Sequence, residues 1–99
     1  MSKKVAEKIK KTTKYCNSLK CGQVNDEEYT YSIERIFVKA KKRNEVRFAV
    51  YKDTVREKEV YVPRSLDVTE LELIELIRNA IKAEVFSKEF LEMLTQELV

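Results

Sequence analysis

The stretch YTYSIERIFVKAKKRNEVRFAVYKDTVREKEVYVP, residues 29–63, decides the fold, because it contains runs of alternating side chains separated by polar turns. Alternation with a period of two is typical of strands, since successive side chains point to opposite faces of a sheet. The stretch therefore predicts a meander of antiparallel strands near residues 29–41, 45–52 and 57–63. Pro63 ends the last strand because it has no N–H to donate.

The pairing of these strands follows from the requirement that apolar side chains share one face of the sheet. A first turn over residues 42–44 and a second turn centred on Thr54 meet that requirement. The predicted cross-strand pairs are Ile36–Val50, Val38–Phe48, Ala40–Val46, Phe48–Val60 and Val46–Val62. Because residues 29–33 alternate in the phase opposite to Ile36, a bulge is expected near residues 34–35.

The N-terminal segment, residues 1–22, is predicted to contain a basic helix over residues 2–21. An apolar stripe recurs there at helical spacings of four and three: Val5, Ile9, Thr12, Cys16 and Leu19. Gly22 follows where a left-handed C-cap is expected. The segment carries a charge of about +6. Residues 23–28 are polar and are interpreted as a short linker to the sheet.

Residues 67–98 are predicted to form a C-terminal helical hairpin. Thr69 with Glu72 makes a capping box for the first helix, and the sequence also permits Asp67 with Glu70. This helix is expected to stop or bend near Glu84. Ser87 is the expected N-cap of the second helix. The whole chain, residues 1–99, is thus interpreted as a single α+β domain with element order α-β-β-β-α-α.

Composition points to a small soluble protein. The chain is 43% hydrophobic and 37% charged, which suits a domain with one modest core. Its apolar runs are too short to span a membrane, and the N-terminal lysines are not followed by the apolar region of a signal peptide. We therefore expect a cytoplasmic protein without membrane contact.

The residue types that usually carry catalysis are scarce. The chain has no histidine and a single glycine, so the commonest general base and the usual phosphate-binding loops are missing. Cys16 and Cys21 are the only cysteines, and two thiols cannot complete a zinc site. The sequence therefore predicts a protein that is not an enzyme and binds no cofactor and no metal.

Nucleic-acid binding is the first predicted function. The second face of the predicted sheet combines cations with aromatic rings, and the first turn adds further cations: Phe37, Lys39, Lys41, Lys42, Arg43, Arg47, Tyr51 and Tyr61. Cations neutralise phosphates and aromatic rings stack on exposed bases. Glu57 and Glu59 share this face and would repel phosphate. Alternatively, the N-terminal helix covers the rings and they form a second small core.

Protein–protein interaction is the alternative function, either with a larger partner or as a homodimer. The apolar faces of the C-terminal helices look wider than one small sheet can cover. The candidate contact residues are Leu71, Leu76, Phe90, Met93, Leu94 and Leu98. Together these patterns predict a small non-catalytic binding protein that uses either its sheet or its C-terminal helices.

Overall fold

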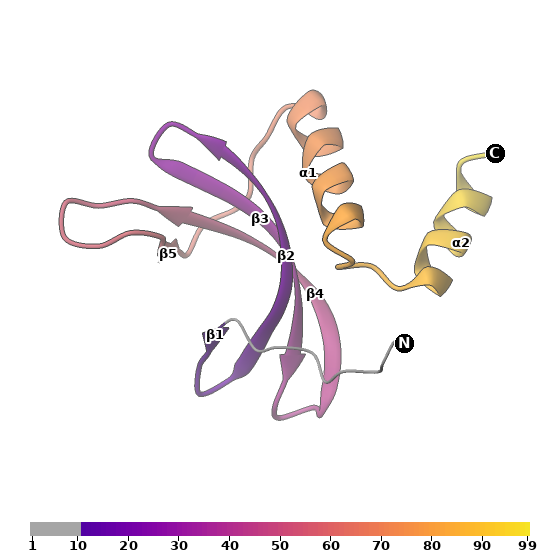
Figure 1. The fold of residues 1–99 in the computed structure, drawn as a ribbon, viewed down its shortest axis with the longest axis horizontal. Coiled ribbons are helices and arrows are strands. Elements are labelled where there is room, and N and C mark those ends of the chain that lie inside the picture. Colours follow the sequence, from indigo (N-terminus) through magenta and orange to yellow (C-terminus); the bar gives the residue numbers. More distant parts are fainter. Residues whose placement is uncertain (1–10) are drawn as a thin grey trace.

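The computed structural model describes residues 11–99 and has an antiparallel sheet followed by two helices, so the protein belongs to the α+β class (Figure 1). Each strand pairs with the next one along the chain, in the order β1-β2-β3-β4-β5. The elements are β1 (Lys11–Thr12), β2 (Cys16–Asp26), β3 (Tyr29–Val38), β4 (Arg43–Lys52), β5 (Val60–Val62), α1 (Glu70–Lys82) and α2 (Lys88–Glu97). Neither helix is long and apolar enough to cross a bilayer.

The predicted N-terminal helix is wrong over its described part, where the chain forms β1 and most of β2; residues 1–10 lie outside the described residues. Pairing with β3 gives residues 16–26 a long partner that a weak helical stripe does not offer. A bulge between Ser18 and Lys20 interrupts the alternation of β2. Cys16 and Leu19 are therefore three residues apart, a spacing that is also typical of a helix. The predicted linker is also strand, up to Asp26.

The predicted register across the first turn is wrong. The turn covers residues 39–42, and Tyr31 pairs with Val50, Ile33 with Phe48 and Arg35 with Val46. The pairing differs from the prediction by an odd number of residues, so Ile36 lies on the opposite face of the sheet. β5 is displaced by an even number, with Val50 facing Val62, and the faces of β4 and β5 remain as predicted. The expected bulge at residues 34–35 is absent from β3.

One face of the sheet, called here the helical face, carries the apolar core beneath α1. Tyr31, Ile33 and Val50 from the sheet pack with Leu76, Ala80 and Val85 from the α1 region. Gly22 allows this approach, because a Cβ atom at its position would lie 2.3 Å from the backbone nitrogen of Ala80. Gly22 is therefore a helix-contact residue and not the predicted C-cap.

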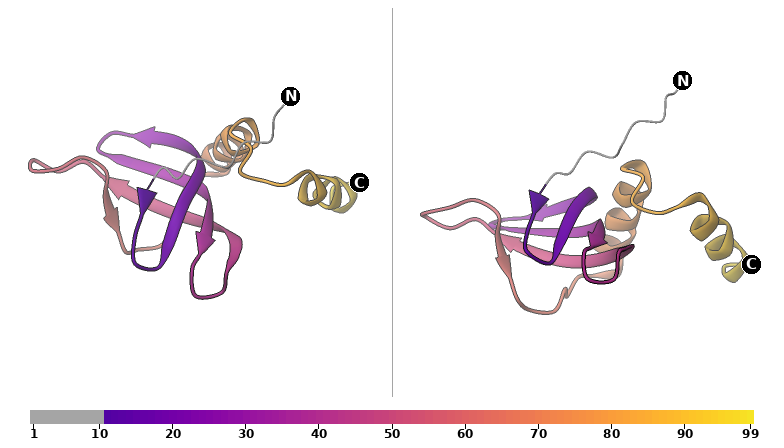
Figure 2. Two further views of the ribbon diagram at one scale, coloured as in Figure 1. Left: turned by 60° about the horizontal axis from the view of Figure 1, so that its bottom comes forward. Right: turned by 90° about the horizontal axis from the view of Figure 1, so that it is seen from below.

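The helix caps agree with the sequence. Thr69 and Glu72 form the predicted capping box, and the Ser87 side chain accepts a hydrogen bond from the Phe90 N–H. α1 ends at Lys82, close to the predicted stop at Glu84. However, α2 stands away from both the sheet and α1 and buries none of its residues, so the helices do not pack as a hairpin (Figures 1 and 2).

The connections between elements use charged residues in the left-handed backbone conformation. These residues are Glu27, Lys42, Glu59 and Glu84, with φ angles between 51° and 60°. Such a conformation is strained for residues other than glycine. The only glycine, Gly22, lies within β2 and has no positive φ.

Candidate interaction surfaces

The face of the sheet opposite α1, called here the ionic face, contains a buried ion pair. Glu34 is only 3% exposed and lies opposite Arg47 on the neighbouring strand. Arg47 donates from Nη2 and Nε to Glu34 Oε1 at 2.8 and 3.1 Å. Tyr51 and Ser32 donate their hydroxyls to Oε2 at 2.6 and 2.9 Å. Both carboxylate oxygens of Glu34 are therefore fully used within the sheet.

These contacts fix the protonation states of the network. Burial, followed by the hydrogen bond to Glu34, raises the pKa of Tyr51, so its hydroxyl remains a donor well above neutral pH. Partial burial alone would lower the pKa of Arg47, but its hydrogen bonds and attraction to Glu34 outweigh burial and raise it. Within the described residues, every buried side-chain polar atom has a hydrogen-bond partner. The network is thus a satisfied structural unit.

This arrangement divides the predicted nucleic-acid site. Tyr51 is 5% exposed, so its ring is not available for stacking on a base. Phe37 pairs with Asn44 on the helical face and lies away from Arg47 and Tyr61, which stay on the ionic face. The remaining cations, Lys39, Lys41, Lys42 and Arg43, lie in the β3–β4 turn or at its edge. Glu57 and Glu59 lie in the loop before β5 and not on the sheet.

A second aromatic residue joins Tyr61 on the ionic face. A pocket of about 550 Å³ is lined by Thr13, Tyr15, Cys16, Arg47, Tyr51 and Tyr61. Tyr15 is 73% exposed and Tyr61 is 54% exposed. Lys39 joins the two turns at this end of the sheet, because its backbone N–H bonds Tyr15 O at 3.0 Å and its Nζ bonds Thr13 O at 2.7 Å. Tyr15 was not predicted as a site residue, because a helix over residues 2–21 would not bring it next to the β3–β4 turn.

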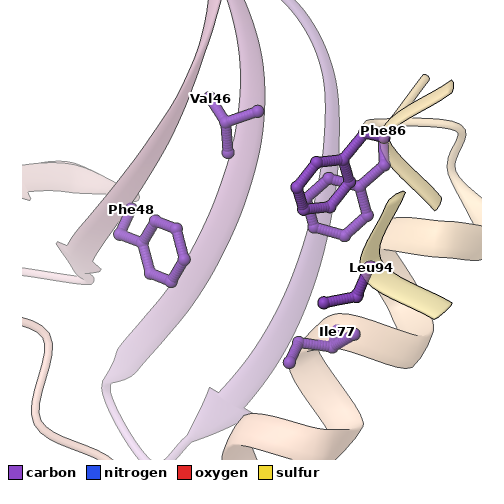
Figure 3. Close-up of a pocket in the computed structure, with 6 residues that line it drawn as sticks. Val46, Phe48, Ile77, Phe86 and Leu94 are labelled. Atoms are coloured by element: carbon purple, nitrogen blue, oxygen red, sulfur yellow. The ribbon is translucent and has the colours of Figure 1, made fainter. Parts of the chain in front are cut away.

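The helical face contains an open apolar groove between β4 and α2. It has a volume of about 340 Å³ and its lining is entirely apolar: Val46, Phe48, Ile77, Phe86, Phe90 and Leu94. Figure 3 shows Val46 and Phe48 on one side of the groove and Ile77, Phe86 and Leu94 on the other. Phe48 is 53% exposed although its side chain points to the same side as the core. α1 packs against β2 and β3 and leaves this part of β4 uncovered.

The predicted partner-binding residues separate into three groups. Phe90 and Leu94 line the groove. Leu71, Met93 and Leu98 are exposed but are not among its lining residues. Leu76 is fully buried in the core, so its prediction as a contact residue is wrong.

The groove residues on β4 were missed as contact residues because a strand pattern alone does not say which part of an apolar face a helix will cover. Val46 and Phe48 alternate correctly for an inward face, and this pattern predicted that both lie in the core. Ile77 and Phe86 were likewise missed; Ile77 lies within α1, and Phe86 lies in the connection between α1 and α2.

The side chains of the described region include no group of three or more metal-ligating residues. Comparison of the chain with models of known protein families, with curated proteins and with solved structures gives no match.

Proposed function

We propose that this protein is a non-catalytic protein-interaction module that holds an apolar protein segment in the groove between β4 and α2. One observation carries the proposal: α2 buries none of its residues, yet it directs Phe90 and Leu94 towards a groove whose far side is Phe48 and Val46. Exposed apolar surfaces of this kind mark interaction sites on small proteins.

The length of α2 supports this proposal. An isolated helix shorter than roughly 12–15 residues is marginal in water, because nucleation is costly and few hydrogen bonds follow. α2 has ten residues, none of which is fully buried by the rest of the described chain. An apolar segment in the groove would contact α2 and β4 together. Full burial of a phenylalanine contributes about 1.5–3 kcal/mol, so Phe48 and Phe90 could anchor such a segment.

A displayed peptide library provides the test. Selection on the purified protein should enrich peptides with closely spaced apolar side chains, and fluorescence anisotropy then measures their affinity. Phe90→Ser should weaken binding at least about tenfold, because Phe90 lines the groove. Leu71→Ser is the matched control, since Leu71 is 83% exposed, lies on α1 and does not line the groove. Equal affinity of the selected peptides for wild type and Phe90→Ser would refute the proposal.

Nucleic-acid binding is a second candidate, supported by the neighbouring turns of the ionic face. Tyr15 and Tyr61 present exposed rings, and the turn over residues 39–42, which Lys39 links to Tyr15, adds cations beside Tyr15. Single strands are commonly held by such combinations of rings and cations. Anisotropy of short single-stranded oligonucleotides should show affinity that falls with salt. Tyr15→Ala should reduce binding, whereas Val55→Ala, also at an exposed position, should not.

A further inference from the structure

The outer edge of β4 lies beside the apolar groove and is largely unpaired. β5 pairs only with Val50, Tyr51 and Lys52. The rest of β4 has β3 on one side, and no strand of the described chain lies on the other. The opposite edge of the sheet ends in β1, which is only two residues long. β1 pairs only with Asn17 and Ser18 of β2, and α1 packs against the following part of β2 at Gly22 and Gln23. The open edge beside the groove is residues 44–48.

Two residues on this edge, Val46 and Phe48, line the groove with their side chains and also direct their backbone hydrogen-bonding groups outward. The N–H of Asp53 bonds Glu28 O at 2.8 Å, immediately beyond the paired residues of β3 and β4. Because antiparallel strands alternate between inward and outward groups, Arg47 and Glu45 bond β3, whereas Val46 and Phe48 direct their N–H and C=O groups outward. The same two residues place their side chains on the helical face.

Natural proteins usually protect such an edge with lysine, proline or a bulge. Residues 44–49, NEVRFA, contain neither lysine nor proline, and the pairing of β3 with β4 is regular throughout. The charged residues of this edge, Glu45 and Arg47, lie on the ionic face, so the edge beside exposed Phe48 suits the addition of a strand.

We infer that the partner at this site is a second copy of the chain, whose β4 pairs antiparallel with the first β4 around a two-fold axis at Val46. The inference rests on the proposed function and names its partner. In this register Val46 faces its own copy, and Glu45 faces Arg47 of the second copy on both sides of the axis. Opposite charges at facing positions stabilise a strand pair, and here they would extend the ion pairs that Arg47 makes with Glu34 and that Glu45 makes with Arg43.

The other register that this edge allows is less favourable than the one centred on Val46. Shifting the pairing so that Val46 faces Phe48 of the second copy would place Arg47 directly opposite its own copy. Facing like charges destabilise a strand pair, so the register centred on Val46 is favoured. It also joins the two copies of Val46 and Phe48 into one apolar stripe on the helical face. A short strand pair buries less than the roughly 1,200–2,000 Å² of stable interfaces, so the dimer is expected to be weak and concentration-dependent.

Disulfide trapping tests this register. In a Cys21→Ser background, Val46→Cys should form a covalent dimer under mild oxidation, because facing hydrogen-bonded residues have Cα atoms about 5.5 Å apart, within the range of disulfides. The remaining native thiol, Cys16, is buried. Asn44→Cys is the matched control on the same edge and face. Its two copies would lie four residues apart along the strands, about 13 Å, and should remain monomeric.

Sedimentation velocity of the wild-type protein from about 10 µM to about 1 mM should show a shift from monomer to dimer. Val46→Lys should abolish the shift while leaving the circular dichroism spectrum unchanged, since Val46 is 43% exposed. A wild type that stays monomeric, or equal trapping of Asn44→Cys and Val46→Cys, overturns the inference. If the protein stays monomeric but still binds peptides in the groove, the proposed function stands without the dimer. If the protein neither dimerises nor binds peptides, both the dimer and the proposed function are refuted.

Discussion

The two faces of the sheet differ in a way that reverses the usual expectation. The ionic face contains a carboxylate and a guanidinium, yet Glu34, Ser32 and Tyr51 are buried and fully bonded. The helical face is apolar, yet Val46 and Phe48 remain exposed beside a groove. The polarity of a face therefore does not decide whether it is available to a partner. What decides it is how completely the other elements cover or satisfy it.

The largest expected effect comes from breaking the ion pair of the ionic face. Arg47→Met should lower the free energy of unfolding by roughly 4 kcal/mol, because it leaves the buried Glu34 carboxylate without its cation. Urea denaturation followed by circular dichroism measures this loss. The double variant Glu34→Leu with Arg47→Met should recover most of it, since no uncompensated charge is left. A double variant as unstable as Arg47→Met would show that the network stabilises the fold by more than charge compensation.

The closed part of the helical face should be nearly as sensitive. Gly22→Ala should cost roughly 3 kcal/mol, because the new Cβ would clash with the backbone of Ala80 and displace α1. The same denaturation experiment measures the loss. Adding Ala80→Gly should not restore stability, since the clash involves backbone atoms that glycine keeps. Restoration would mean that the side chain of Ala80 is the obstacle.

Tyr51→Phe should have an intermediate effect that depends on pH. Near pH 8 the loss of the hydrogen bond to Glu34 should cost roughly 2 kcal/mol. Because the folded pKa of Tyr51 is raised, its contribution is complete below about pH 10 and declines as pH rises towards that raised value. The difference between wild type and variant should therefore narrow above pH 10.

Tyr31 has a pKa raised by burial and by Asp26, and it is present in both proteins, so its effect cancels in this comparison. Denaturation at several pH values between 8 and 11 gives the difference. A difference that stays constant or widens over this range would contradict the assignment.

The open part of the helical face should be the least sensitive. Leu94→Ala should change the free energy of unfolding of the monomer by less than about 0.5 kcal/mol, because α2 buries no residue. Leu76→Ala, on α1, is the contrasting control and should cost roughly 3 kcal/mol because Leu76 is fully buried. A large effect of Leu94→Ala in dilute protein would mean that α2 packs against the body of the molecule.

The C-terminal half of the fold could be predicted because its signals are local. The capping box at Thr69 and the N-cap at Ser87 act within one helical turn, and both appear in the structure. Strands β3, β4 and β5 were also predicted, since alternation is local. Their register was not, because it depends on which groups each face can satisfy. The prediction excluded charge from a buried face, whereas Glu34 is buried with Arg47 as its partner.

The N-terminal strands and the groove required information that one segment does not contain. Residues 16–26 form a strand because β3 supplies the partner. The groove exists because α1 covers β2 and β3 and leaves Phe48 open, a matter of helix placement. Tyr15 belongs to the candidate surface because its turn lies beside Lys39, a contact that depends on the pairing of distant strands.

The residues with left-handed backbone conformation at the turns are positions where substitution could raise the thermal stability of the protein. Glu27, Lys42, Glu59 and Glu84 each hold a backbone conformation that costs a residue with a side chain about 1 kcal/mol or more. Glycine or asparagine at these four positions would relieve that strain without touching the buried network or the core. A more heat-resistant version could then serve as a scaffold on which variants of the groove are compared without loss of folded protein.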